Sequence, residues 1–282
     1  MTKTVSDKFV LILYYRYGWV IYIMNVIILA AGSGIRLGEH TQDIPKTLVD
    51  INGKSILERQ ISLLRKHKVK EIFVVTGYKK ETYVLKDVEY FFNPKYSETE
   101  QLTSMMVARR KIFGDVLIIF GDIIFDSDIL QQVLASNDDI TIPIDLNWKK
   151  SYEEEPNKPV DKVLVNQKKI VKISAKEISL ESKNEVGEFL GIIKLSTAGS
   201  KILVKKYEEL EKSHTGKFHD ADSLNKAKLV DILQELIDSK IEISPLIISG
   251  KWCEIDTPKD LERAKKIFKN IDIEWKKFLT KL

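Results

Sequence analysis

A loop of small residues follows an apolar run early in the chain, in the order Leu29, Ala30, Ala31, Gly32, Ser33, Gly34. Glycine has no side chain, so the backbone N–H groups of such a loop can approach a phosphate closely. Arg36 follows directly, and Lys46 lies in the segment Pro45-Lys46-Thr47-Leu48. Positive charges there would neutralise the β- and γ-phosphates of a nucleoside triphosphate as pyrophosphate leaves. The pattern predicts a triphosphate site with Arg36 and Lys46 in catalytic roles.

Two other nucleotide-binding loops do not fit this segment. A Rossmann dehydrogenase has G-x-G-x-x-G spacing and an acidic residue at the end of a strand about 20 residues further on. A P-loop has the pattern G-x-x-x-x-G-K-[ST]. The sequence shows neither pattern after residue 30. A different class of nucleotide site is therefore favoured.

Two aspartates that lie far apart in the sequence are candidate metal ligands. Asp122 follows Phe120 and Gly121, and Asp256 follows Glu254 and Ile255. Magnesium takes one or two carboxylates together with phosphate oxygens and water. Either aspartate alone is explained better by a turn or by the approach to a helix N-cap. Because they occur together with the glycine loop, we expect Asp122 and Asp256 to hold Mg²⁺ against the α-phosphate.

These motifs together resemble a known family. LAAGSGIRL followed by PKTL is similar to the opening signature of the sugar-nucleotidyltransferase superfamily, and within it to the small cytidylyltransferases for phosphocholine, 2-aminoethylphosphonate and inositol phosphate. The likeness runs from Met24 to about Phe268. It implies a Rossmann-like nucleotidyltransferase fold, metal-binding roles for Asp122 and Asp256, and a lesser metal role for Glu254.

Further segments extend the resemblance around the nucleotide. The segment Thr76-Gly77-Tyr78 resembles the second strand and turn of the family, and Asn93 to Ser104 resembles the segment beside the nucleotide in the choline-type enzymes. Glu100 stands where those enzymes carry another Asn. The implied nucleotide-binding residues are Leu29, Ala30, Ala31, Gly32, Ser33, Gly34, Thr76, Gly77, Tyr78, Ser104, Gly121 and Asp122.

The resemblance also implies a site for the acceptor. Lys176 stands where family members place a lysine on the strand that crosses the active site, and it would bind the acceptor phosphate; a solvated surface lysine is the competing interpretation. Gly187 to Ile192 resembles a segment of the aminoethylphosphonate branch, in which Glu188 would meet a substrate amine. Asp145 and Trp148 would add carboxylate and cation–π contacts to that ammonium.

The predicted reaction is a direct in-line transfer. An anionic oxygen of the acceptor attacks the α-phosphorus of CTP, so no protein nucleophile is needed, and Cys253 and the four histidines form no recognisable nucleophilic arrangement. The favoured acceptors are 2-aminoethylphosphonate and phosphocholine. The alternatives are a sugar-1-phosphate or inositol-1-phosphate nucleotidyltransferase and, from another class, a non-catalytic nucleotide-binding regulatory module. A glycosyltransferase would use a D-x-D motif, but Asp126-Ser127-Asp128 is better explained as the cap of a helix.

The elements that must position these residues alternate along the chain. Short apolar runs predict strands, and helical stripes such as 55–66 lie between the first of them. This order is typical of a single doubly wound α/β domain with a mostly parallel sheet. The polar segment 147–185 predicts an inserted β-hairpin and lid. The expected strands are 25–30, 71–76, 88–93, 116–120, 140–144, 163–165, 170–174 and 188–195; the later helices are 198–212, 224–239 and 258–268.

Composition limits the class of protein. The 282 residues carry a net charge of +4 without a basic block, so a nucleic-acid partner is not expected, and the single cysteine fits a cytoplasmic location. Residues 9–23 are apolar but too short to span a bilayer comfortably. We expect residues 1–23 to be an extension outside the fold, 24–270 to be the nucleotidyltransferase domain and 271–282 a tail. The expected partners are CTP and a small phosphorylated or phosphonylated acceptor, and a homodimer is left open.

Overall fold

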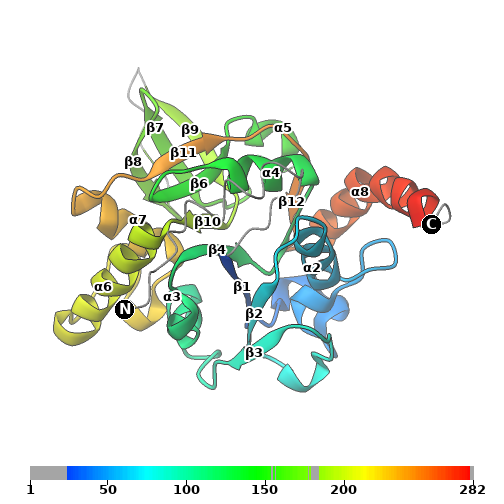
Figure 1. Ribbon diagram of the computed structural model, residues 1–282, viewed down its shortest axis with the longest axis horizontal. Coiled ribbons are helices and arrows are strands. Elements are labelled where there is room, and N and C mark those ends of the chain that lie inside the picture. The colour runs from blue at the N-terminus through cyan, green and yellow to red at the C-terminus, as the bar shows by residue number, and fades with distance from the viewer. Residues whose placement is uncertain (1–23, 154, 156, 177, 179–183, 280–282) are drawn as a thin grey trace, which may run out of the picture.

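The computed structural model describes residues 24–153, 155, 157–176, 178 and 184–279. The predicted N-terminal extension, residues 1–23, lies outside the described residues. One large sheet runs through the molecule, with helices on both of its faces (Figure 1).

The centre of the sheet is parallel. Strands β3, β2, β1 and β4 lie side by side in that order, and Leu29 of β1 faces Val75 of β2 and Phe120 of β4. Nearly every residue of β1 and β4 is buried, as expected for strands that are covered on both faces. Because the strands are parallel, their carboxyl ends meet at one edge of the sheet, and the loops that follow them form one surface. Their bounds are β1 Met24–Ala30, β2 Glu71–Thr76, β3 Glu89–Phe92 and β4 Asp115–Phe120.

Beyond β4 the sheet becomes mixed. β10 is antiparallel to β4 and β6, and from β6 the sheet continues through β9 to the β7–β8 hairpin. β11 pairs with β6 in parallel. A separate two-stranded ladder joins β5 to β12. The bounds are β5 Ile123–Phe125, β6 Ile140–Asp145, β7 Lys162–Asn166, β8 Lys169–Ser174, β9 Glu185–Phe189, β10 Ile192–Leu195, β11 Ser244–Ile247 and β12 Trp252–Glu254.

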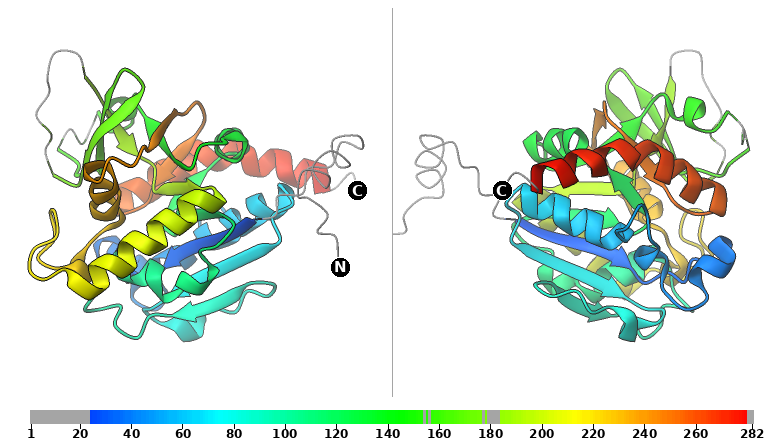
Figure 2. Two further views of the ribbon diagram at one scale, coloured as in Figure 1. Left: turned by 60° about the vertical axis from the view of Figure 1, so that its left-hand side comes forward. Right: turned by 90° about the vertical axis from the view of Figure 1, so that its right-hand side faces the viewer.

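The helices form two layers. On one face lie α3 (Gln101–Val107), α6 (Thr197–Ser213) and α7 (Leu229–Asp238), and on the other lie α2 (Ile56–Lys66), α4 (Ser127–Ala135) and α8 (Pro258–Leu279) (Figure 2). The short α5 (Trp148–Ser151) begins the inserted segment. Single 3-10 turns occupy Ile35–Thr41, Lys46–Leu48, Lys80–Thr82, Arg109–Lys111 and Leu224–Lys226.

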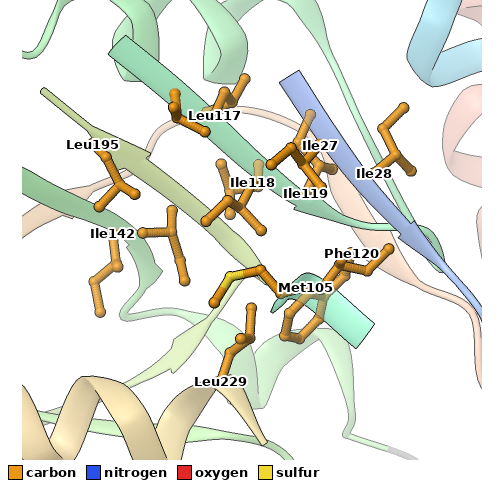
Figure 3. Close-up of a cluster of buried hydrophobic side chains, with 14 of the residues drawn as sticks. Ile27, Ile28, Met105, Leu117, Ile118, Ile119, Phe120, Ile142, Leu195 and Leu229 are labelled. Carbon is orange, nitrogen blue, oxygen red and sulfur yellow. The ribbon is translucent and has the colours of Figure 1, made fainter. Parts of the chain in front are cut away.

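The core extends over both faces of the sheet, and Figure 3 shows the part that lies between the sheet and the α3/α7 layer. Ile27, Ile118 and Ile142 come from three strands of the sheet, and Met105 and Leu229 from the two helices; all are fully buried. Burying one such side chain stabilises the fold by roughly 1.5–3 kcal/mol. The central strands are therefore rigid supports for the loops that follow them.

The predicted α/β sheet and the inserted hairpin are confirmed, and so is the cap interpretation of Asp126, whose side chain accepts a hydrogen bond from the amide of Ile129 at 3.1 Å. Three element boundaries were wrong. The expected strand 188–195 is split into β9 and β10, because Gly191 makes a turn with φ 76°. The expected helix 224–239 is a 3-10 turn followed by α7, and the helix from Pro258 continues to Leu279, through the segment expected to be a tail.

Candidate functional site

The carboxyl ends of the central strands are tied together by backbone contacts. The amide of Gly121 donates to Leu29 O at 2.9 Å, and the amide of Tyr78 donates to Ala31 O at 3.1 Å. Gly121 has no room for a side chain, since a Cβ there would lie 2.4 Å from Thr47 Cγ2. Gly77 is equally crowded by Tyr96. Both glycines are needed so that three loops can lie against one another.

The two glycines of the glycine loop have different surroundings. A Cβ on Gly32 would meet no described atom within 4 Å, so the space beside Gly32 is open. Gly34 has φ 72°, and a Cβ there would lie 2.7 Å from Lys46 Cβ. Gly34 therefore lets the loop pack closely on Lys46, and Gly32 leaves room for a ligand.

Other predicted nucleotide residues support this surface from within. Thr76 is buried and donates to Phe91 O, and Ser104 is buried and accepts from the Asn93 side chain at 3.0 Å. The Tyr83 hydroxyl donates to Ala30 O at 2.7 Å and lies 2.8 Å from Thr47 Oγ1. The loop that bears Lys46 is thus fixed to the end of β1.

Three carboxylates meet at this edge of the sheet. Asp122, Glu254 and Asp256 each offer an oxygen, and these oxygens lie within 4.8 Å of one another. The β5–β12 ladder brings them together: Glu254 pairs with Ile123, and the amide of Ile255 donates to Asp122 O at 2.9 Å. We call Asp122, Glu254 and Asp256 the carboxylate cluster.

The two predicted cations lie on this cluster. Lys46 Nζ is 2.8 Å from Asp122 Oδ2 and also forms a very short contact with Asp256 Oδ1. Arg36 Nη2 is 2.9 Å from Asp256 Oδ2, and its side chain is 61% exposed, whereas Lys46 is buried. In this structure the cluster holds both cations that were predicted to contact phosphates.

Burial and charge shift the titration of the cluster. Burial alone would lower the pKa of Lys46, but the carboxylates of Asp122 and Asp256 outweigh it and raise that pKa above its ordinary value. Burial raises the pKa of Glu254 well above its ordinary value, and the charges of Asp256 and Asp122 raise it further. A bound cation would favour the charged form of Glu254.

The donor set of the cluster fits a divalent metal. All its ligand atoms are carboxylate oxygens, which hard cations such as Mg²⁺ prefer. Asp122 Oδ1 is buried and has no hydrogen-bond partner among the described residues. An unpaired buried oxygen is costly, and a metal ion would satisfy it. Glu254 therefore joins the two aspartates predicted from the sequence as a candidate ligand.

The predicted acceptor residues lie on the inserted segment and the adjoining strands. Glu188 pairs with Asp145 across the β6–β9 ladder and is 2% exposed. Its Oε1 accepts from the Tyr152 hydroxyl at 3.1 Å, and its Oε2 has no partner among the described residues. Burial raises the pKa of Glu188 to about 8. The Trp148 ring packs on Tyr152 and is itself buried, so it supports the ring whose hydroxyl donates to Glu188.

Lys176 also belongs to the inserted segment, after the end of β8. Its side chain is 66% exposed and forms an ion pair with Asp220 at 3.1 Å. This geometry matches the competing interpretation of a surface lysine. Asp145 also has structural partners, since its carboxylate accepts from Asn147 N at 2.7 Å and from Trp252 Nε1 at 3.0 Å.

Two functional neighbours were missed by sequence reasoning. Gln60 of α2 is buried and donates to Phe120 O at 2.8 Å and Ile123 O at 2.7 Å, on either side of Asp122. A polar residue beside the apolar stripe of that helix was the available signal. Lys158 lies in the inserted segment among many other charged residues, so its position in the sequence gave no signal. In the structure it forms ion pairs with Glu254 and Asp260.

Comparison with known proteins identifies a family model and several similar proteins. Residues 26–164 match the family model described as a MobA-like NTP transferase domain. A CTP:phosphoglutamine cytidylyltransferase of Campylobacter jejuni is 28% identical over 85% of this chain and 98% of its own. A choline-phosphate cytidylyltransferase of Haemophilus influenzae is 36% identical over 38% of this chain and 47% of its own.

Solved structures share the fold. The inositol-1-phosphate CTP transferase of T. maritima superposes with a TM-score of 0.67 and 22% identity, over 88% of this chain and 98% of that one. The Rossmann-like nucleotidyltransferase architecture expected from the sequence is thereby confirmed. Within the described residues, no helix combines the length and the apolar character that a membrane crossing requires.

Proposed function

This chain belongs to the nucleotidyltransferase family, and from that premise we propose that it transfers CMP from CTP to a small phosphate or phosphonate acceptor, with Mg²⁺ as cofactor. The carboxylate cluster beneath the glycine loop carries the proposal, because it combines three oxygen ligands with two cations at the end of β1. The similar proteins are named as cytidylyltransferases for phosphorylated small molecules, and this similarity supports CTP as the donor.

The residues of the loop would bind the triphosphate. The open space beside Gly32 admits a phosphate, and backbone N–H groups there can donate to it. Arg36 is largely exposed and can leave Asp256 for the β- and γ-phosphates, and Lys46 can do the same once the carboxylates have another cation. Asp122, Asp256 and Glu254 would hold Mg²⁺, which supplies charge neutralisation at the phosphates when bound.

The chemical step needs no protein nucleophile. An anionic oxygen of the acceptor forms a bond to the α-phosphorus of CTP, and the bond from that phosphorus to the bridging oxygen breaks. The electron pair leaves with pyrophosphate, whose added negative charge Arg36 and Lys46 would stabilise. Catalysis then consists of positioning the two substrates and balancing charge. Cys253 takes no part, since it is buried and its pKa is raised to about 11 by burial.

We further propose an acceptor that bears an amine, with 2-aminoethylphosphonate and phosphocholine favoured. The unpartnered oxygen of Glu188 can accept a hydrogen bond from the primary ammonium of 2-aminoethylphosphonate. The quaternary ammonium of phosphocholine has no N–H to donate and would interact with Glu188 by charge alone. Either positive charge would also favour the ionised carboxylate. Asp145 and the face of Trp148 would complete the contact. Because Glu188 is buried and accepts from Tyr152 of the inserted segment, an acceptor would reach it only when that segment moves. Lys176, which is exposed and belongs to the same segment, is still proposed to contact the phosphate of the acceptor.

A pyrophosphate-release assay tests this function. CTP, UTP, ATP and GTP are each combined with phosphocholine, 2-aminoethylphosphonate, phosphoglutamine, inositol-1-phosphate and a sugar 1-phosphate, with and without Mg²⁺. We expect turnover with CTP and an amine-bearing acceptor only, and a CMP conjugate in the mass spectrum. Turnover with UTP and a sugar phosphate would replace the proposed substrates. Nucleotide binding without turnover in any combination would favour a regulatory module.

A further inference from the structure

Asp260 lies directly behind the carboxylate cluster, in the first turn of α8. The residue is fully buried. Its Oδ2 accepts from Asp256 N at 3.0 Å, from Thr257 N at 2.9 Å and from Thr257 Oγ1 at 3.0 Å. One carboxylate oxygen thus fixes the backbone of the residue that presents Asp256 to the cluster.

The other oxygen of Asp260 faces the inserted segment. Lys158 Nζ lies 2.7 Å from Asp260 Oδ1, and Arg263 forms a very short contact with the same oxygen. Lys158 Nζ is also 3.9 Å from Glu254 Oε2 and 4.5 Å from the ring centre of Tyr152, the residue that donates to Glu188. Asp260 therefore connects the turn of Asp256 to the segment proposed to cover the acceptor.

Ordinary helix capping accounts for only part of this arrangement. Thr257 and Asp260 exchange hydrogen bonds at the start of α8, as residues of a capping box do. Such a box does not require a bond to the residue before the cap, nor two cations on the second oxygen, of which Lys158 is buried and Arg263 half-buried. Burying these charges together is costly unless all of them are paired. The additional contacts point to a role in the site.

We propose that Asp260 is a positioning residue for the reaction: its Oδ2 aims the Asp256 carboxylate at Asp122 and Glu254, and its Oδ1 anchors the inserted segment through Lys158. This inference rests on the proposed function. Outer partners that orient metal ligands typically change metal affinity or activity by about 10–100-fold when they are lost. The two oxygens should therefore have separable effects.

Three variants separate them. Asp260→Ala removes both links, and Asp260→Asn keeps an oxygen for Asp256 and Thr257 but loses the anionic partner of Lys158. Lys158→Met leaves Asp260 in place and removes the anchor, together with the longer contact of Lys158 to Glu254 at 3.9 Å. Binding of Mn²⁺ alone is followed by electron paramagnetic resonance, beside kcat and the KM of CTP and of the acceptor. Ser196→Ala serves as control, since Ser196 caps α6 with hydrogen bonds to the amides of Ala198 and Gly199.

We expect Asp260→Ala to weaken Mn²⁺ binding by about 10–100-fold and to lower kcat. Asp260→Asn should restore Mn²⁺ binding to within a few-fold while the KM of the acceptor stays raised, as in Lys158→Met. Ser196→Ala should change neither. If Asp260→Ala does not fold, the double variant with Lys158→Met, which removes one unpaired cation, carries the same test.

Mn²⁺ binding and kinetics of folded Asp260→Ala equal to those of the parent would overturn the positioning role, as would equal losses in Ser196→Ala. Failure of the parent chain itself to bind Mn²⁺ or to turn over CTP would instead reject the proposed function. The two failures are therefore distinguishable.

Discussion

Replacing Lys46 with Met should have opposite effects on catalysis and on the binding of a metal alone. Lys46 Nζ lies between Asp122 and Asp256, at 2.8 Å from the former, and the side chain is buried. A divalent ion and the ammonium group therefore compete for the same carboxylate oxygens. Removing the ammonium removes the competitor, whereas it also removes a cation that the leaving pyrophosphate needs.

The size of both effects can be bounded. A pair of unit charges 4 Å apart interacts by about 4 kcal/mol at an effective dielectric constant of about 20. If only about 1.4 kcal/mol of this opposes the metal, Mn²⁺ alone binds Lys46→Met about tenfold more tightly than the parent. Loss of one electrostatic partner typically costs about 10²–10³ in rate. Without metal the variant should also be less stable by roughly 3–5 kcal/mol, because Asp122 loses the buried ammonium while Asp256 keeps only its pair with Arg36.

Two measurements decide the matter. Mn²⁺ affinity is determined by electron paramagnetic resonance, and melting temperatures are recorded with and without Mn²⁺. We expect Mn²⁺ to raise the melting temperature of Lys46→Met more than that of the parent. Lys111→Met is the matched control, because Lys111 pairs with Glu89 at 2.8 Å, away from the cluster. Weaker Mn²⁺ binding by Lys46→Met, or near-normal turnover, would refute the competition and the catalytic role respectively.

Three further predictions follow from the same contacts. Asp122→Ala should reduce turnover by about 10²–10³ while the protein stays folded, and normal turnover would remove Asp122 from the site. Gln60→Leu should lower kcat by about tenfold with less effect on the KM of CTP, because the turn of Asp122 loses two hydrogen bonds; an unchanged kcat in a folded variant would show that the turn holds its shape alone. Glu188→Gln tests the raised pKa of about 8, against an ordinary value of 4.5. The Glu188 carboxyl releases its proton at lower pH in the unfolded chain than in the folded one. The free energy of unfolding of the parent should therefore decrease as the pH rises from about 4.5 to about 8. Glutamine stays neutral, and the variant should be more stable than the parent at pH 8 by up to about 4 kcal/mol but nearly equal to it at about pH 4, below the pKa of the unfolded chain; identical unfolding curves at both pH values would contradict the buried, proton-binding carboxyl.

Local signals in the sequence predicted most of the central sheet. Continuous apolar runs correctly gave β1, β2 and β4, because strands covered on both faces must be apolar throughout. The helix at Ser55 was equally clear from its apolar stripe, and the structure adds a capping box of Ser55 and Glu58 within the same short segment. Where apolar pattern and turn chemistry coincide, the position of an element follows from a few neighbouring residues.

The meeting of the three carboxylates could not be predicted in this way. It depends on the β5–β12 ladder, whose strands are each three residues long and lie more than a hundred positions apart. Runs of this length are not distinctive in a sequence. The roles of Lys158 and Asp260 could not be predicted from the sequence for the same reason, because the two residues that form this ion pair lie far apart in the chain. Before the structure, Asp122 and Asp256 were connected only by their joint occurrence with the glycine loop and by resemblance to a family.

The same ladder bears on where the functional unit ends. The segment that matches the family model, residues 26–164, contains Arg36, Lys46 and Asp122 but neither Glu254 nor Asp256. Without β12, the strand β5 would lose its pairing partner, and Lys46 would keep a single carboxylate. A buried ammonium with so little compensation is unfavourable. The C-terminal third of the described chain is therefore part of the site, which supports treating residues 24–270 as one domain.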